Sequence, residues 1–186
     1  MANEKKLDCV ILGLLSHENL TGYEIKKWMD TTLHFFWSAS YGSIYPTLRE
    51  ITANGFATKS ETRESGRDKA IYSITQQGRE HLLSWLAKPV DKDELRYETM
   101  LKLFFGAEAG AEITKLHIDI FEAKARGELS YLMKGIKNLE SVLDREEAHL
   151  YYHLTAMFGV KVFNAYLDWC REAKKILEKR KVNKNA

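Results

Sequence analysis

The sequence predicts a mainly α-helical protein with one small β-hairpin, arranged in two domains. Apolar residues recur at the helical spacing of three and four along most of the chain, and they alternate with polar residues only between residues 56 and 74. The polar stretch KPVDKDELR, which contains Pro89, interrupts the helical pattern. We therefore predict an N-terminal domain over residues 1–88 and an α-helical C-terminal domain over residues 89–186.

The composition is that of a globular protein, with 45% hydrophobic and 29% charged residues. No apolar run approaches the length of a membrane span and the start lacks the features of a secretory signal, so we expect a cytoplasmic protein without a membrane partner. Cys9 and Cys170 lie in apolar helical patterns, and we expect both to be reduced and buried. The net charge of +2 neither indicates nor excludes nucleic acid, so the placement of single charges matters more than their sum.

Three helices are predicted in the first part of the N-terminal domain. The first is indicated by apolar residues at helical spacing, namely Leu7, Val10, Ile11, Leu14 and Leu15. Thr21 is followed three residues later by Glu24, the pattern of a capping box, which predicts a second helix from Gly22 to Leu33.

The third helix is predicted from Tyr41 to Asn54, with Ser40 as its N-cap. Its apolar face is Ile44, Leu48 and Ile51. The Asn54-Gly55 pair is a helix-stop signal.

A β-hairpin and a fourth helix complete the N-terminal domain. Residues 56–61 and 69–74 alternate in polarity and predict two strands, and the polar stretch TRESGRD between them predicts the hairpin loop. Thr75 is the predicted N-cap of the fourth helix. The apolar set of that helix is Leu82, Leu83, Trp85 and Leu86.

The C-terminal domain is predicted to be helical throughout, over residues 93–105, 109–143 and 146–179. A helix of about 34 residues is about 50 Å long, which exceeds the diameter of one small domain. Long helices with a continuous apolar stripe usually pack on a partner helix, often from a second copy of the chain. The stripe of the last helix predicts the following dimerisation residues: Leu150, Leu154, Phe158, Tyr166 and Trp169.

Three helices followed by a hairpin are the order of a winged helix-turn-helix, in which the third helix enters the DNA major groove and the hairpin, or wing, reaches the flanking backbone. The third helix opens with short and aromatic hydrogen-bonding side chains at an end that attracts phosphate. Further cations lie on the second helix and on the hairpin, namely Lys26, Lys27, Arg63, Arg67 and Lys69. These features indicate double-stranded DNA as the partner. The alternative, a winged-helix protein-interaction module without sequence-specific DNA binding, stays open at this point.

Between Asp8 and Pro89 the sequence resembles the PadR family of bacterial transcriptional regulators. The resemblance rests on the segments ILGLL, TGYEI, FFWSASYGSIYPTLREI, NGF and GRDKAIYSITQQGREHLLSWL. Two later segments, YETMLKLFF and LDWCREAKKIL, resemble the longer PadR subgroup, whose C-terminal helices form the dimer. The similarity covers most of the chain and is weakest from about residue 106 to 150.

The resemblance implies a homodimer that binds a two-fold-symmetric operator and represses a nearby gene. Carried onto matching positions, it implies the following DNA contacts: Tyr23, Ser40, Tyr41, Ser43 and Tyr45, with Arg67 and Lys69 on the wing. Many relatives have extra Lys or Arg where this chain has Ser-Tyr-Gly-Ser, so base preference does not transfer.

Some members of the family bind planar aromatic effectors such as phenolic acids. Phe36 and Trp37, beside the third helix, are candidates for the wall of such a pocket, although packing in the core is the simpler role for both. Tyr45 has a similar alternative, since its ring can serve packing alone.

No pattern in the sequence indicates catalysis, a cofactor or a metal ion. His149 and His153 have the helical spacing of metal ligands, but HLYYH lacks the glutamate of a metalloprotease helix. A glycine-rich phosphate loop, a GxSxG motif and a cysteine pair at metal spacing are all absent from the sequence. We therefore predict a protein that is not an enzyme.

Overall fold

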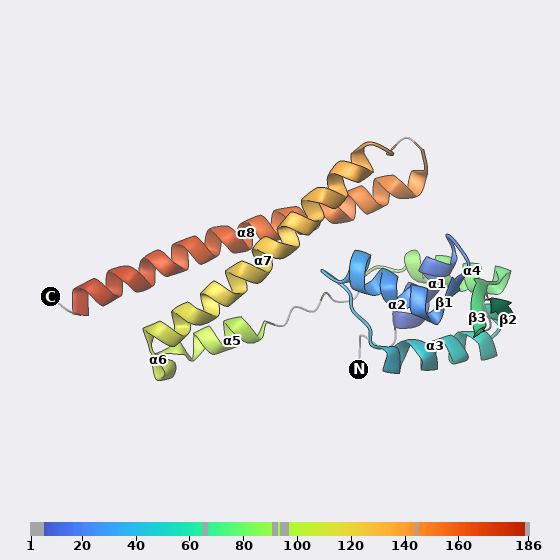
Figure 1. Cartoon of the computed structure of the whole chain (residues 1–186), viewed down its shortest axis with the longest axis horizontal. Helices are drawn as coiled ribbons and strands as arrows, with labels where there is room; N and C mark the ends of the chain where they lie inside the picture. Colours follow the sequence, from blue (N-terminus) through green and yellow to red (C-terminus); the bar gives the residue numbers. More distant parts are fainter. Residues whose placement is uncertain (1–5, 65–66, 91–92, 94–96, 144, 185–186) are drawn as a thin grey trace. The chain divides into compact units, whose positions relative to one another are not determined.

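The computed structural model describes residues 6–64, 67–90, 93, 97–143 and 145–184 (Figure 1). Side chains are described for the same residues except 62–64, 67–68 and 181–184. The chain divides into two compact units, Met1–Asp93 and Glu94–Ala186, whereas the sequence suggested a boundary after residue 88. No helix in the described part of the chain is long and apolar enough to cross a membrane.

The N-terminal unit is a winged helix, as the sequence predicts. Its elements are α1 (Leu7–Leu15), β1 (Leu20–Thr21), α2 (Gly22–Trp28), a π-helix (Met29–Leu33), α3 (Tyr41–Ala53), β2 (Ala57–Glu64), β3 (Arg67–Ile74) and α4 (Gln76–Leu86). The strands form an antiparallel sheet in the order β1-β3-β2. Figure 1 shows α3 along one side of this unit and the β2–β3 hairpin beside α4.

The core of this unit is apolar and matches the predicted positions in part: Ile11 and Leu15 of α1 are buried as predicted, whereas Val10 and Leu14 are only partly buried and Leu12, outside the predicted set, is fully buried. The most deeply buried come from the first three helices and the π-helix, namely Ile11, Leu12, Leu15, Ile25, Met29, Ile44, Leu48 and Ile51. Burying one such side chain contributes about 1.5–3 kcal/mol of transfer free energy. The face predicted for the third helix is therefore the one that faces the core.

Side chains cap the starts of α2 and α4 as predicted. The backbone N–H of Glu24 donates to Thr21 Oγ1 at 3.2 Å, and the backbone N–H of Thr21 donates to Glu24 Oε2 at 2.8 Å. Both halves of the predicted capping box are therefore present. At α4, the backbone N–H of Gly78 donates to Thr75 Oγ1 at 3.0 Å. Such caps satisfy N–H groups that have no partner within the helix.

The structure differs from the prediction around α2. The sequence analysis assigns no strand before the second helix, but Leu20 and Thr21 form β1, which pairs with Tyr72 and Ile71 of β3. Two residues are too short a strand to show an alternating pattern. The predicted second helix also changes from α to π at Met29. The sequence does not indicate this change, because backbone hydrogen bonding leaves little trace in the spacing of side chains.

The hairpin and α4 also depart from the prediction. The strands extend further toward the loop than residues 56–61 and 69–74, since pairing continues to Glu64 and Arg67. Leu82 of α4 is buried, but Leu83 and Leu86 are mostly exposed and do not belong to the core of this unit. Apolar residues at adjacent helix positions point in different directions, so a single packed face does not bury all of them.

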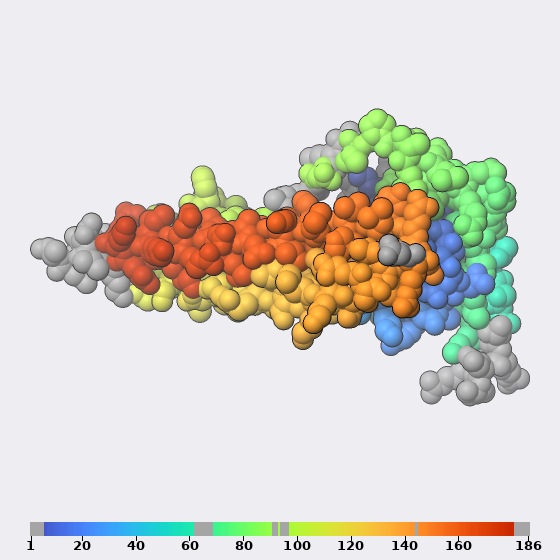
Figure 2. All heavy atoms as spheres, turned by 90° about the horizontal axis from the view of Figure 1, so that it is seen from above, coloured from blue at the N-terminus to red at the C-terminus, as the bar shows by residue number. Residues whose placement is uncertain are grey.

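The C-terminal unit is a long antiparallel helix pair with two short helices at one end. Its elements are α5 (Glu98–Phe104), α6 (Gly106–Ala109), α7 (Ala111–Glu140) and α8 (Glu147–Lys184). Figures 1 and 2 show α7 and α8 side by side over much of their length. The predicted helix over residues 109–143 begins later because Gly110 has a φ of 84°, outside the helical range.

An aromatic group and a charged group join α7 to α8. Tyr97, Phe121, Tyr166 and Trp169 contact one another at ring centroid distances of 5.4 to 6.1 Å. Lys174 of α8 pairs with Glu122 of α7 and, at 3.0 Å, with Asp119. The hydrogen bond from Lys174 holds the pKa of Glu122 below its usual range.

Candidate nucleic-acid interface

The start of α3 presents two serine hydroxyl groups. Ser40 occupies the N-cap position, but its side chain makes no capping hydrogen bond, which corrects the predicted cap. Instead, Ser40 Oγ lies 3.3 Å from Ser43 Oγ, and Ser43 Oγ donates to the backbone carbonyl of Ser40 at 2.9 Å. The first backbone N–H groups of a helix lack partners within it, so this end suits an anionic group such as phosphate.

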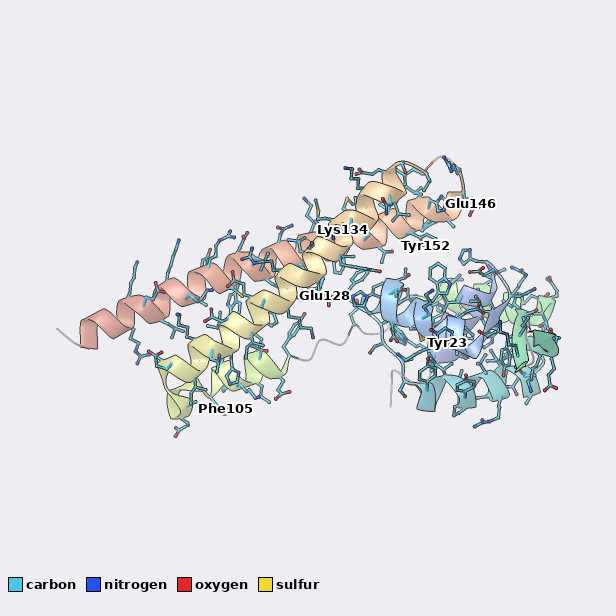
Figure 3. All side chains as sticks on the ribbon, viewed as in Figure 1. Tyr23, Phe105, Glu128, Lys134, Glu146 and Tyr152 are labelled. Atoms are coloured by element: carbon cyan, nitrogen blue, oxygen red, sulfur yellow. The ribbon has the colours of Figure 1, made fainter. Side chains whose placement is uncertain are left out.

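Three exposed tyrosines lie on α2 and in the first half of α3. Tyr23 of α2 is 64% exposed, and Tyr41 and Tyr45 of α3 are 45% and 42% exposed (Figure 3 labels Tyr23). The rings of Tyr41 and Tyr45 are nearly parallel, with an interplanar angle of 18° and centroids 6.2 Å apart. Tyr45 therefore packs on its neighbours and still presents part of its ring to solvent, so that a contact with DNA remains a prediction.

Lysines on α2 and β3 give the same region positive charge. Lys26 forms an ion pair with Asp30, and its Nζ lies 5.5 Å from the centroid of the Tyr41 ring. Lys69 on β3 is exposed. Hydrogen bonds from Thr21 lower the pKa of Glu24, and the charges of Lys69 and Lys27 lower it further. The carboxylate of Glu24 thus lies within the field of Lys69, a predicted DNA contact, and of Lys27, a further cation of the second helix.

Arg67 is the first residue of β3 and is paired with Glu64 of β2 in the sheet register. Its backbone places it at the loop end of the hairpin, as predicted, while its side chain lies outside those described. The arrangement brings together an exposed aromatic and hydroxyl surface, a helix N-terminus and a β-ribbon with cations. Such a surface can bind phosphate groups through charge and read base edges through hydrogen bonds.

The predicted dimerisation residues separate into two groups. Leu150, Leu154 and Phe158 lie four residues apart along α8 and form an exposed apolar stripe, with Leu154 46% and Phe158 63% exposed. Tyr166 and Trp169 instead belong to the aromatic group between α7 and α8 of the same chain. The spacing of apolar residues along a helix does not distinguish packing within one chain from packing between two chains.

A second exposed apolar surface, missed by the sequence analysis, lies where α5, α6 and the start of α7 meet. Phe104 is 82% exposed, and its neighbour Phe105 is also exposed (Figure 3 labels Phe105). The other members are Leu101, Ile113, Leu116 and Ile120. Exposed apolar patches of this kind mark interaction surfaces.

Comparison with known proteins accounts for both units. The model of the transcriptional regulator PadR-like family matches residues 11–84, and the model named virulence activator alpha C-term matches residues 95–178. The chain belongs to the PadR-like family of transcriptional regulators. The resemblance drawn from the sequence motifs is thereby confirmed.

Three relatives illustrate this PadR-like similarity. The negative transcriptional regulator PadR of Bacillus subtilis is 36% identical over 102 residues, which are 53% of this chain and 56% of that protein. Its crystal structure with operator DNA matches 92% of this chain and 98% of that one, with a TM-score of 0.77 and 26% identity. A probable transcriptional regulator of Mycobacterium tuberculosis is 27% identical over 92% of this chain and 97% of that protein. The Vibrio cholerae virulence activator AphA matches 94% and 99% of the two chains, with a TM-score of 0.73 and 25% identity.

The candidate effector residues of this PadR-like chain lie between the π-helix and α3. Phe36 is about half exposed, Trp37 is partly buried, and the rings of Phe35 and Phe36 meet edge to face at 4.6 Å. Neither Phe36 nor Trp37 belongs to the buried core of the unit. A hollow elsewhere, along α7, is lined by charged and small residues: Asp119, Glu122, Ala123, Arg126, Gly127 and Ser130. A role for Phe36 and Trp37 in binding an effector stays a prediction.

The structure brings His81 beside the adjacent residues Asp8 and Cys9, a contact that the sequence spacing does not indicate. His81 Nε2 of α4 lies 3.1 Å from Asp8 Oδ2 of α1, and the Cys9 thiol lies within 4.8 Å of both. The His81 ring also stacks on Phe56 at 4.4 Å. We interpret the group as a contact that joins α1 to α4 and assign no metal ion to it.

Both cysteines are expected to react slowly in the folded protein. Burial, together with the Asp8 carboxylate, raises the pKa of Cys9 to about 11, and burial also raises the pKa of Cys170. A thiol with a pKa of about 11 is about 0.1% thiolate at pH 8, and only the thiolate is nucleophilic. We expect Ellman's reagent to modify less than about a tenth of the thiols in the time that free cysteine needs to react fully. Denaturant should release both thiols, whereas fast modification of the folded protein would contradict the buried positions.

Proposed function

We propose that this PadR-like chain is a homodimeric, cytoplasmic repressor that binds a palindromic operator. The observation that carries the proposal is the exposed Tyr and Ser surface at the start of α3, beside the wing. The similar PadR of Bacillus subtilis was crystallised with operator DNA and is named a negative regulator, which supports the same role here. In this role, α3 of each subunit reads one half-site in the major groove, and Arg67 and Lys69 hold the flanking backbone.

The exposed stripe on α8 supports the homodimer. Two copies that cover Leu150, Leu154 and Phe158 on each other remove apolar surface that a single chain leaves in water. A two-fold dimer presents two α3 helices to one duplex, and half-sites then lie about one turn, or 34–36 Å, apart. The two-fold axis of the protein thus implies a palindromic operator.

Release by a small aromatic effector completes the proposal. Bacillus subtilis PadR was also crystallised with p-coumaric acid, at 25% identity to this chain and a TM-score of 0.71. An aromatic acid that binds better to one arrangement of the dimer shifts the population toward that arrangement. Phe36 and Trp37 are the side chains that we assign to such a pocket, and we assign the chain no catalytic role.

The first experiment measures binding of the purified protein to its own upstream DNA by fluorescence anisotropy across a salt series. Specific binding about 10³-fold tighter than to a scrambled duplex, and weakening as salt rises, is the expected result. Absence of binding at low salt would overturn the DNA-binding role. The chain would then be a winged-helix module for protein contacts.

Removing the wing cations tests the assignment of Arg67 and Lys69. The double variant Arg67→Ala, Lys69→Ala should bind every duplex more weakly, because phosphate contacts carry no sequence information. The slope of log K against log salt should be shallower by about 2–4, since each lost phosphate contact removes about 0.9 and a dimer has two wings. Lys134→Ala, Lys137→Ala removes two exposed cations from α7 and serves as the charge-matched control. Equal slopes for the two variants would contradict a wing contact.

A further inference from the structure

Gly22, the first residue of α2, lies directly against the ring of Tyr45 in α3. A Cβ atom at Gly22 would meet Tyr45 Cε1 at 2.8 Å, Cζ at 3.0 Å and Oη at 3.1 Å. Gly22 is buried, and among the described glycines only Gly55 and Gly110 have a positive φ. The backbone at residue 22 therefore accepts any L-residue, and the space taken by Tyr45 is what calls for glycine.

The start of α2, against which the Tyr45 ring lies, is held in place by two sets of contacts. Thr21, the neighbour of Gly22, belongs to β1 and pairs with Ile71 of β3. The same Thr21 closes the capping box with Glu24. The start of α2 is thus anchored to the sheet and to its own first turn, so it presents a firm surface to the tyrosine ring.

We propose that Gly22 is a positioning residue for DNA binding, because the absence of a side chain at Gly22 leaves room for the hydroxyl end of the Tyr45 ring beside the start of α2, and so fixes where the phenol meets the duplex. This inference rests on the proposed function, in which Tyr45 contacts DNA. Tyr45 is 42% exposed, so the ring is held on one side and open on the other. Lys26, also on α2, lies over Tyr41. The second helix therefore supports both α3 tyrosines.

Gly22→Ala is expected to change DNA affinity without changing the stability of the fold. The atoms that an added methyl group meets belong to the end of a side chain with two rotatable bonds, not to backbone. Gly22→Ala therefore displaces the ring and leaves the fold in place. Alanine also has the higher helix propensity, which opposes any loss of stability.

The experiment is a double-mutant cycle on the full chain, with Gly22→Ala, Tyr45→Ala and the double variant bound to the upstream DNA. Gly22→Ala is expected to lower affinity about 5- to 20-fold, with a melting temperature within about 3 °C of the original protein. The double variant is expected to bind no more weakly than Tyr45→Ala alone. Tyr45→Phe, which keeps the ring and loses the hydroxyl, should show part of the loss. Gly13→Ala is the matched control, because no atom lies within 4 Å of its added Cβ.

Three outcomes would overturn the inference. Gly22→Ala could bind like the original protein, its effect could multiply with that of Tyr45→Ala, or its melting temperature could fall by more than about 10 °C. If Tyr45→Ala bound DNA with full affinity, Tyr45 would not contact DNA and Gly22 would have no positioning role. The proposed function would still stand as long as the original protein bound DNA. Only failure of the original protein to bind would overturn both.

Discussion

Replacing Leu154 and Phe158 by glutamate is expected to convert the proposed dimer into monomers. Both side chains are about half exposed or more in a single chain, and burying one contributes about 1.5–3 kcal/mol. A two-fold interface repeats each contribution, and an unpaired carboxylate in the same place costs more than the lost burial. Operator affinity should fall at least about 100-fold, since a monomer loses the effective concentration that links two half-sites. Light scattering after size-exclusion chromatography measures the mass directly.

Asn164→Glu is the control for that experiment. Asn164 is an exposed residue of the same helix, and the substitution adds the same kind of charge as one glutamate of the double variant. It should leave the mass and the affinity unchanged. A Leu154→Glu, Phe158→Glu protein that remains a dimer would place the interface elsewhere, with the exposed surface around Phe104 as the next candidate.

Gly78→Ala is expected to destabilise the winged helix severely. A Cβ atom at Gly78 would lie 2.0 Å from the backbone carbonyl oxygen of Phe56 and 2.9 Å from its carbonyl carbon. Backbone atoms do not rotate away as a side chain does, so α4 must move away from Phe56. Overpacking of this kind costs about 3 kcal/mol or more, which lowers the melting temperature by about 12–24 °C in a domain of this size. Thermal unfolding followed by circular dichroism measures the shift.

The control for Gly78→Ala is again Gly13→Ala. Gly13 lies inside α1 with space around its Cβ position, so alanine should stabilise the domain by about 0.5–1 kcal/mol. The same chemical change is therefore expected to have opposite signs at two positions of one domain. Equal effects at the two positions would contradict the close approach of α4 to Phe56.

The sequence predicts the winged helix well because its strongest signals are local. Thr21 with Glu24, and Thr75, mark helix starts, and the spacing of Ile44, Leu48 and Ile51 marks a buried face. Each signal spans only a few residues, and each states a physical requirement of the backbone or the core. The structure has both helix starts and the buried face where these residues predict them.

The remaining features depend on contacts between residues far apart in the sequence. β1 exists because β3 offers it an edge, and Asp8 meets His81 because α1 packs on α4. The stripe on α8 predicts five dimerisation residues, yet Tyr166 and Trp169 pack inside their own chain. At the candidate site, the sequence marks Tyr45 but gives no sign that Gly22 supports it. Apolar spacing indicates which residues favour a covering surface, but it does not identify that surface.

Thr21 belongs to β1 and is also the N-cap of α2, and this has a consequence for DNA binding by the wing. Thr21 pairs with Ile71 of β3 and also caps α2, so one residue joins the base of the wing to the helix-turn-helix. Ordering a free ribbon on a duplex would cost conformational entropy at the moment of binding. Here the folding of the domain has already fixed the base of the ribbon relative to α2. In the proposed complex, the wing would therefore bind DNA as a preorganised arm, and its cations would contact phosphate with little entropic penalty.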